Sequence, residues 1–189
     1  MHYRLSSPVP ENHFIDVECS IDRIAAETIE IQLPAWRPGR YELQNFAKNI
    51  QRFSVFDTAG NPLIFRKITK DRWLIQTSEV TGIIVRYNYY ANIQNAGSSY
   101  ISNDFWYVNP VNLCVYAEGY INESCTLELA IPDNFQIACG LKKKDTKTLS
   151  AKDYYELVDS PLMASATLQH RTYQLQAITK VSWWPKAKP

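Results

Sequence analysis

The sequence predicts an all-β domain, mainly an antiparallel β-sandwich, with one short helix near residues 150–158. Apolar and polar residues alternate in many short runs, clusters of Pro, Gly, Asn and Asp separate these runs, and one segment carries a helix start signal. Short strands joined by frequent turns are typical of antiparallel sandwiches and barrel-like domains. A chain of 189 residues is long enough to bury the core of one such domain.

The first half of the chain contains the clearest alternation. Its turn cluster Asp-Thr-Ala-Gly-Asn-Pro at 57–62 is a strong break, so the runs on either side of it are expected to be separate strands. The run at 82–93 is the longest β-branched and aromatic one, which favours a central strand. The strands predicted in this half are 13–21, 28–33, 50–56, 63–68, 73–77 and 82–93, the fourth and fifth forming a hairpin.

The second half adds strands at 124–131, 135–139 and 167–178, with short aromatic segments over 100–118. The predicted helix runs from 150 to 158. Ser150 is a plausible N-cap, Asp153 stands three residues later, and Pro161 ends the segment. We therefore expect residues 1–178 to form one β-sandwich domain and residues 179–189 to be a tail or the start of a linker.

Composition restricts the partners. Hydrophobic residues make up 46% of the chain and charged residues 21%, with a formal net charge of +1. The one basic run, three lysines at 142–144, is followed by an aspartate and is expected to be a solvated turn. These features argue against nucleic acid and against a membrane as partner.

The four cysteines show no C-x-x-C spacing and no adjacent histidine, so they are expected to be reduced and structural. The N-terminus has no apolar h-region of a signal peptide, which favours a cytoplasmic location. No apolar run approaches the length of a membrane span.

The motifs of the common hydrolases are missing. The chain has three histidines, His2, His13 and His170, and none of them forms the H-E-x-x-H arrangement of a zinc site. No G-x-S-x-G or phosphate-binding glycine loop is present. An enzyme in its own right would need His13, His170 and a carboxylate brought together by the fold. We therefore expect no catalytic residue, no metal ligand and no cofactor in this chain.

An unusual stretch, LPAWRPGRY, occupies residues 33–41. Pro34 ends the preceding strand, because proline cannot donate to a strand ladder, and the Pro-Gly pair at 38–39 indicates a tight turn. Trp36 and Tyr41 flank this turn, and Arg37 or Arg40 is placed to stack on the rings. Apolar residues at 43, 46, 47 and 50 then suggest a helical turn. The stretch is interpreted as a rigid corner, with a ligand site as the alternative.

This stretch also carries a resemblance. It resembles, with FAKNI behind it, the N-terminal region of M61 peptidases, the glycyl aminopeptidase family. Other segments match that region in the same order: HFIDV at 13–17, KDRW at 70–73 and DYYELVDSP at 153–161. The resemblance spans roughly residues 3–178. This chain departs from it at 162–165, where similar proteins continue with an acidic residue and a glycine.

The resemblance implies a non-catalytic N-terminal β domain that supports or walls the substrate cleft of a zinc aminopeptidase. Zinc and the catalytic residues would lie in a catalytic domain downstream, so that domain is the expected partner, in cis or in trans. Self-association through an exposed partner surface is a further expectation. The candidate interdomain or partner surface comprises Tyr154, Tyr155, Leu157, Asp159, Trp183 and Trp184.

An alternative of a different class is a stand-alone peptide- or carbohydrate-binding module. Aromatic rings would provide the platforms and neighbouring polar side chains the hydrogen bonds. The candidate ligand platform comprises Trp36, Tyr100, Trp106, Tyr107, Asn103 and Asp104.

Overall fold

The computed structural model describes residues 1–37, 42–175 and 178–185, with side chains described as far as residue 171. Within these residues the chain is built mainly of strands in antiparallel-rich sheets, and β1 and β10 form a parallel pair. The largest sheet has, in spatial order, β12 (Lys142–Lys143), β13 (Thr148–Ala151), β10 (Cys125–Ala130), β1 (His2–Ser6), β2 (Phe14–Asp22), β7 (Gly82–Tyr90) and β4 (Ile50–Asp57).

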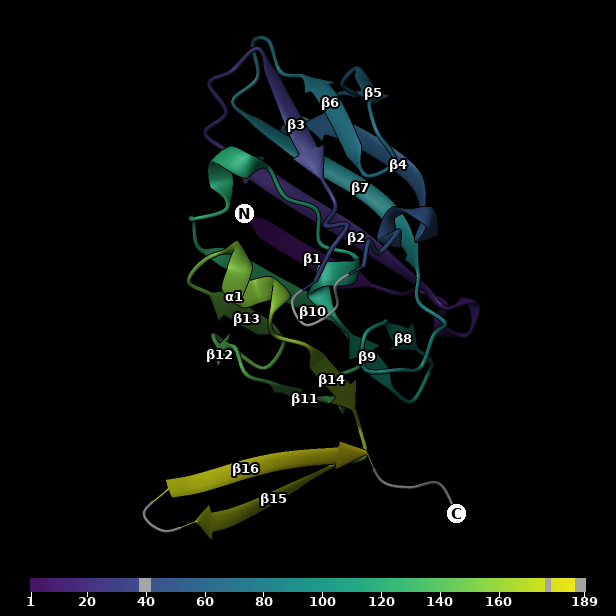
Figure 1. Cartoon of the computed structure of the whole chain (residues 1–189), viewed down its shortest axis with the longest axis vertical. Coiled ribbons are helices and arrows are strands. Elements are labelled where there is room, and N and C mark those ends of the chain that lie inside the picture. Colours follow the sequence, from purple (N-terminus) through teal and green to yellow (C-terminus); the bar gives the residue numbers. More distant parts are fainter. Residues whose placement is uncertain (38–41, 176–177, 186–189) are drawn as a thin grey trace.

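Three smaller sheets complete the strands of the described part (Figure 1). One has the order β11 (Gln136–Cys139), β14 (Leu162–Ser165), β9 (Trp106–Val108) and β8 (Tyr100–Ile101). Another has the order β3 (Thr28–Gln32), β6 (Arg72–Gln76) and β5 (Phe65–Lys67), and the last is the hairpin of β15 (Leu168–Leu175) and β16 (Ile178–Pro185). The helical elements are α1 (Tyr154–Val158) and the 3-10 turns η1 (Pro10–Asn12), η2 (Phe46–Asn49), η3 (Pro110–Asn112) and η4 (Glu118–Tyr120).

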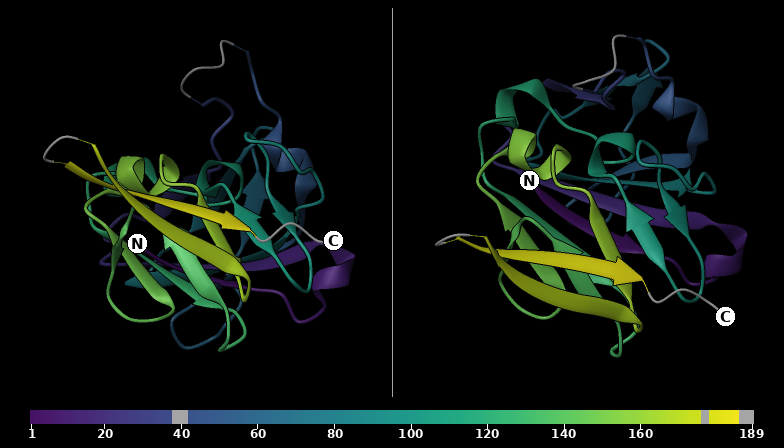
Figure 2. Two further views of the ribbon diagram at one scale, coloured as in Figure 1. Left: turned by 90° about the horizontal axis from the view of Figure 1, so that it is seen from below. Right: turned by 60° about the horizontal axis from the view of Figure 1, so that its bottom comes forward.

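The largest sheet runs through the body (Figure 1). The three-stranded sheet lies over β4 and β7, whereas α1 and the four-stranded sheet lie toward the other end (Figure 1). Phe53 of β4 stacks on Trp73 of β6 with ring centroids 4.3 Å apart, which joins two of these layers. The hairpin of β15 and β16 lies below the body in Figure 1 and passes in front of it in both views of Figure 2.

The alternation of the sequence explains which face is buried. In β2, Ile15, Val17, Cys19 and Ile21 are at most 2% exposed, while the residues between them face outward. The outward face carries ion pairs such as that of Arg86 with Glu18, at 2.7 Å. Since successive side chains of a strand point to opposite faces, one strand serves the core and the solvent at once.

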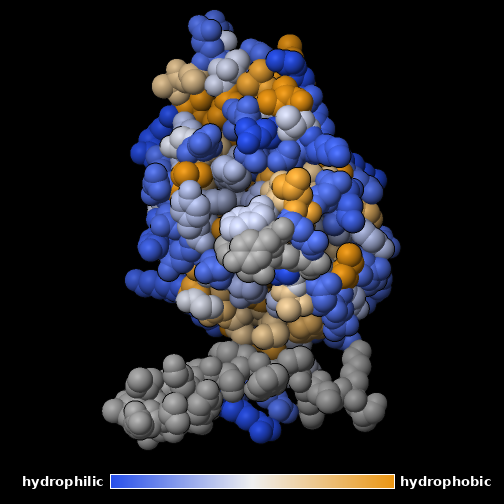
Figure 3. All heavy atoms as spheres, in the orientation of Figure 1, coloured by the Kyte–Doolittle hydropathy of each residue, from blue (hydrophilic) through white to orange (hydrophobic). Residues whose placement is uncertain are grey.

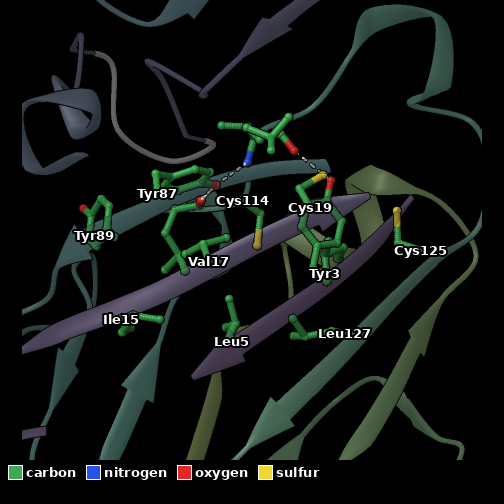
Figure 4. Close-up of a cluster of buried hydrophobic side chains, with 14 of the residues drawn as sticks. Tyr3, Leu5, Ile15, Val17, Cys19, Tyr87, Tyr89, Cys114, Cys125 and Leu127 are labelled. Carbon is green, nitrogen blue, oxygen red and sulfur yellow. Dashed lines mark hydrogen bonds between the residues drawn. The ribbon is translucent and has the colours of Figure 1, made fainter. Parts of the chain in front are cut away.

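An irregular segment, residues 113–115, passes through the core without belonging to a strand. Three buried tyrosines donate to its carbonyl groups: Tyr87 to that of Leu113, Tyr154 to that of Cys114 at 2.7 Å, and Tyr3 to that of Val115 at 2.8 Å. The Tyr87 hydroxyl also accepts from the Val115 N–H at 3.3 Å. Tyr3 and Tyr87 converge on this segment from β1 and β7 (Figure 4). The tyrosines thus satisfy backbone groups that a sheet would otherwise pair.

Most of the predicted strands are confirmed. The strands predicted at 28–33, 50–56 and 124–131 correspond to β3, β4 and β10, and those predicted at 63–68 and 73–77 pair as β5 and β6. The run at 82–93 forms β7, which has a strand on each side, as a central strand should. The predicted helical turn after the LPAWRPGRY stretch is the 3-10 turn η2.

The helix begins later than the sequence indicated. Asp153, rather than Ser150, is the N-cap: its side chain accepts from the Glu156 N–H at 2.7 Å. Ser150 instead pairs with Thr126 as part of β13. The two candidate caps are close in sequence, and pairing with β10 decides between them because it fixes 148–151 in an extended conformation.

Two other expectations need correction. Lys142 and Lys143 form the short edge strand β12 against β13, although both remain exposed as expected of a solvated segment. The predicted strand 167–178 ends at Leu175, and Ile178 already belongs to β16, which pairs back on β15. Residues 179–185 thus lie in a strand. The domain boundary placed at residue 178 stays a prediction.

The four cysteines are free, and Cys19, Cys114 and Cys125 are buried. Desolvation by burial raises the pKa of Cys19 to about 12 and that of Cys125 to about 11. Within the described part of the chain, no helix has the length and apolar character needed to cross a bilayer.

Removing one tyrosine hydroxyl from the core should destabilise the fold. Tyr154→Phe leaves the buried Cys114 carbonyl without its donor, so we expect a loss of about 1–3 kcal/mol in the free energy of unfolding, measured by urea denaturation. Tyr155→Phe is the matched control, because Tyr155 is 59% exposed. Equal stability of the two variants would contradict the role given to Tyr154.

The buried thiols predict a loss of stability at alkaline pH. The unfolded chain ionises Cys19 near its ordinary pKa of 9.0, whereas the folded chain keeps the thiol protonated up to about 12. The contribution of the protonated Cys19 thiol to the free energy of unfolding is therefore fully present below about pH 9 and is lost as pH rises toward 12. Urea unfolding should show a decrease of the order of 1 kcal/mol per pH unit in that range, and a smaller decrease in Cys19→Ala. The same decrease in both proteins would contradict this account.

Candidate functional site

A groove of about 690 Å³ lies among residues 34–37, α1 and the loops beside them. It unites residues far apart in the sequence. Its lining consists of Gln32, Pro34, Ala35, Trp36, Arg37, Arg72, Ala96, Asn109, Val111, Tyr116, Glu118, Ile121, Tyr154, Tyr155, Val158, Asp159 and Pro161.

The first wall is the chain that leaves β3. β3 ends at Gln32, and the residues after it are held by backbone hydrogen bonds from Leu33 N to Asp71 O at 2.9 Å and from Gln44 N to Ala35 O at 2.8 Å. Trp36 is left 49% exposed at the groove. Residues 33–37 are therefore anchored and present the Trp36 ring to the groove. The tight turn predicted at 38–39 lies outside the described residues.

The second wall comes from β3, β6 and the strand-like bridge at Tyr116. Gln32 and Tyr116 exchange two backbone hydrogen bonds of 2.8 Å, and the Tyr116 hydroxyl donates to Gln32 Oε1 at 2.9 Å. Arg72 Nη1 donates to Glu30 Oε1 at 2.5 Å. This hydrogen bond is the main cause that raises the pKa of Arg72, and desolvation raises the pKa of Tyr116.

The third wall is α1 and the residues after it. Tyr154 is 4% exposed and forms a tilted ring contact with Tyr116, with centroids 4.8 Å apart. The next residue, Tyr155, points outward and is 59% exposed. After the helix, the Ser160 hydroxyl donates to Glu156 O at 2.7 Å and fixes the turn that brings Asp159 to the groove.

The fourth wall is a pair of loops with a buried polar core. Ser99 Oγ donates to Asn112 Oδ1 at 2.9 Å, and Asn112 Nδ2 donates to the Gly97 carbonyl at 3.1 Å. The Asn109 N–H donates to Ser99 Oγ at 3.0 Å. These hydrogen bonds hold Ala96 and Asn109 at the groove.

The structure divides the predicted partner surface. Tyr154 and Leu157 lie in the core, at 4% and 0% exposure, because they occupy the inner side of α1. Tyr155 and Asp159 line the groove. Trp183 and Trp184 belong to β16, but their side chains lie outside the described residues. Their role in binding a partner stays a prediction.

The predicted ligand platform is divided as well. Trp106 is 2% exposed and lies in the core, so its ring is not on the surface. Tyr100 and Tyr107 are cross-strand partners on β8 and β9. Trp36, by contrast, lines the groove, and neither Tyr100 nor Tyr107 belongs to that lining.

The polar residues of the predicted platform are engaged in the loops. Asn103 donates to Glu11 and lowers the pKa of that carboxyl. The Asp104 carbonyl accepts from Ser165 Oγ at 2.7 Å. Whether these residues also meet a ligand stays a prediction.

No group of three or more metal-binding side chains gathers among the residues that the structure describes. His13 lies beside Tyr100, at 5.4 Å between ring centroids, and its Nδ1 is 2.6 Å from the Ile101 carbonyl oxygen. His2 is next to Glu128 at 3.7 Å. The described geometry thus presents no zinc-binding constellation around these two histidines.

Several residues of the groove escaped the sequence analysis, among them Tyr116 and Glu118. Each stands at or just after a strand-like segment, where it reads as an ordinary surface residue. Their meeting depends on the bridge between Gln32 and Tyr116, 84 positions apart, which leaves no local signal. Arg37 did have a signal, its place in the LPAWRPGRY stretch.

Comparisons with known proteins agree with this architecture. The model of the Peptidase M61 N-terminal domain family matches residues 2–166. No curated protein matches the chain.

Solved structures give two likenesses. The chain is similar to the aminopeptidase N family protein from Idiomarina loihiensis, with a TM-score of 0.89 and 25% sequence identity over 98% of this chain and 32% of that one. It is also similar in fold to the M1 zinc metallopeptidase from Deinococcus radiodurans, with a TM-score of 0.51 and 14% identity over 100% of this chain and 48% of that one. The chain thus spans about a third of the first protein and about half of the second.

The family match covers most of the β domain and includes all four walls of the groove and the segments that carry the resemblance seen in the sequence. The chain therefore belongs to the Peptidase M61 N-terminal domain family.

Proposed function

We propose that this chain is the non-catalytic β domain of an M61-like zinc aminopeptidase and that its groove forms part of the wall of the substrate cleft. The observation that carries this proposal is the composition of the groove. Its lining joins residues 34–37 with residues 154–161, two stretches that resemble M61 peptidases and are far apart in the sequence.

The lining suits a peptide. Trp36 and Tyr155 offer exposed aromatic surface, and Val111, Val158 and Pro161 add apolar surface. Polar groups of other lining residues lie among them. A groove of several hundred Å³ with apolar walls and a few polar groups is typical of a site for a small ligand or a short peptide segment. Rings with a polar tip suit the boundary between a wall and solvent.

Peptide hydrolysis is assigned to a separate catalytic domain, in cis or in trans. One of the similar structures is a zinc metallopeptidase, which suggests zinc in such a domain. The described residues of this chain hold no cluster of metal ligands. The role proposed for the chain is therefore to position substrate, and no chemical step is assigned to its residues.

The C-terminal hairpin is proposed as an arm that contacts the catalytic domain. β15 and β16 pair with each other over eight positions and lie apart from the other sheets (Figure 1). An isolated two-stranded ribbon is marginally stable in water, so this hairpin would gain from a further surface. On the face shown in Figure 3, apolar side chains gather at the lower end of the body, the end from which the chain continues into β15 in Figure 1. The alternative is that this region contacts a second copy of the chain.

A stand-alone peptide- or carbohydrate-binding module is the second candidate. The half-exposed Trp36 at the edge of a formed groove favours it, since such a module would use the same ring as a platform. The first candidate requires a peptidase domain joined to this chain or bound by it, whereas the second requires none.

The test uses the natural gene product that contains this chain. We expect a polypeptide or stable complex heavier than 21.8 kDa with zinc-dependent aminopeptidase activity. Within it, Trp36→Ala and Tyr155→Ala should each raise KM for peptide substrates about three- to tenfold, with zinc content unchanged, because each removes contact area from the groove.

Ile64→Ala is the matched control, since Ile64 is 78% exposed and does not line the groove. Activity with unchanged KM in both groove variants would reject the wall role. A product of 21.8 kDa without peptidase activity or a peptidase partner would reject the proposal as a whole and favour the stand-alone module.

A further inference from the structure

Arg37 is an unusual residue within the groove. Its Nε is buried and is the one side-chain nitrogen or oxygen of the described residues that is buried without a hydrogen-bond partner. A buried donor without an acceptor costs free energy, so such groups are rare in folded proteins. This one belongs to a permanently charged guanidinium at a ligand-sized groove.

The guanidinium lies directly on Gly97. A Cβ atom added to that glycine would be 2.3 Å from Arg37 Nη2, 2.5 Å from Cζ and 2.8 Å from Nη1. The absence of a side chain at position 97 therefore makes room for the guanidinium. The Gly97 carbonyl is itself fixed by Asn112, so the surface under the guanidinium is held in place.

The two arginines of the groove lining differ in their ion pairs. Arg72, the other cation of the lining, has Glu30 as its ion-pair partner at 2.5 Å. Arg37 forms no ion pair within 4 Å with any residue that the structure describes. Arg37 also acts on Tyr107, where its positive charge partly offsets the rise in phenol pKa that burial causes. Glu118 and Asp159 lie on other walls of the same groove, so its overall charge is balanced.

We propose that Arg37 binds the carboxylate of a peptide that lies in the groove. This inference rests on the proposed role of the groove as a peptide-binding wall and adds the chemical class that it selects. A carboxylate accepts two parallel hydrogen bonds from a guanidinium, and Nε is one of the donors used in that geometry. Either a free C-terminus or an acidic side chain of the peptide provides this group.

The test is direct binding to the 189-residue chain, measured by isothermal titration calorimetry with four peptides. Trialanine is compared with trialanine amide, which tests the C-terminal carboxylate. Ala-Asp-Ala amide is compared with Ala-Asn-Ala amide, which tests an acidic side chain. We expect the carboxylate member of at least one pair to bind about tenfold more tightly at low salt, and the advantage to shrink as salt rises.

Two variants assign the effect to Arg37. Arg37→Gln should remove the preference for the carboxylate and leave binding of the amide peptides unchanged. Gly97→Ala keeps the charge but places a methyl group where the guanidinium lies, so it should reduce the preference several-fold. Arg66→Gln is the matched control, since Arg66 is exposed on β5 and does not line the groove.

Circular dichroism and the urea midpoint establish that each variant is folded. Equal affinity for acid and amide peptides, a preference that survives Arg37→Gln, or no binding of any of the four peptides at millimolar concentration would each overturn the inference. None of these outcomes decides the wall role, which depends on the peptidase kinetics of the natural gene product. The experiments therefore distinguish failure of the carboxylate proposal from failure of the proposed wall role.

Discussion

The structure depends on the hydrogen bonds that three buried tyrosines make to residues 113–115. This segment crosses the core outside any strand, so its backbone groups have no sheet partner. Tyr3 on β1, Tyr87 on β7 and Tyr154 at the start of α1 each donate a hydroxyl to one of its carbonyls. Three elements that are distant in the sequence are thereby attached to one short segment. Burial raises the pKa of all three hydroxyls well above its ordinary value, so they remain protonated donors at alkaline pH as well.

The same attachment positions the groove. Tyr116 directly follows the central segment and bridges to Gln32 at the end of β3, so the chain that leaves β3 starts from a fixed point. Tyr155 directly follows Tyr154 and, one position further around the helix, faces outward. Two walls of the groove, those of Tyr116 and Tyr155, are therefore one residue away from a core hydrogen bond. Such rigid support suits a surface that has to hold a substrate or a second domain in a defined geometry.

A division of labour between domains is consistent with these features. The chain belongs to a family of N-terminal domains and is similar over almost its whole length to about a third of a longer aminopeptidase N family protein. Its groove combines exposed rings, apolar side chains and Arg37, and burial raises the pKa of the Cys19 and Cys114 thiols. Arg37 gives the groove a selective element, since a permanently charged guanidinium favours a carboxylate over an amide.

The sequence alone determined most of the strands, because the alternation of apolar and polar residues has the period of an extended chain whatever its neighbours. It also determined the 57–62 turn, the short helix and the family, since these depend on residues adjacent in the chain. Tertiary structure decided the rest. Pairing of Ser150 with Thr126 moved the helix cap to Asp153, and packing placed Trp106 in the core. The groove, and Arg37 on Gly97 within it, arose from contacts between distant segments, for which no local pattern exists.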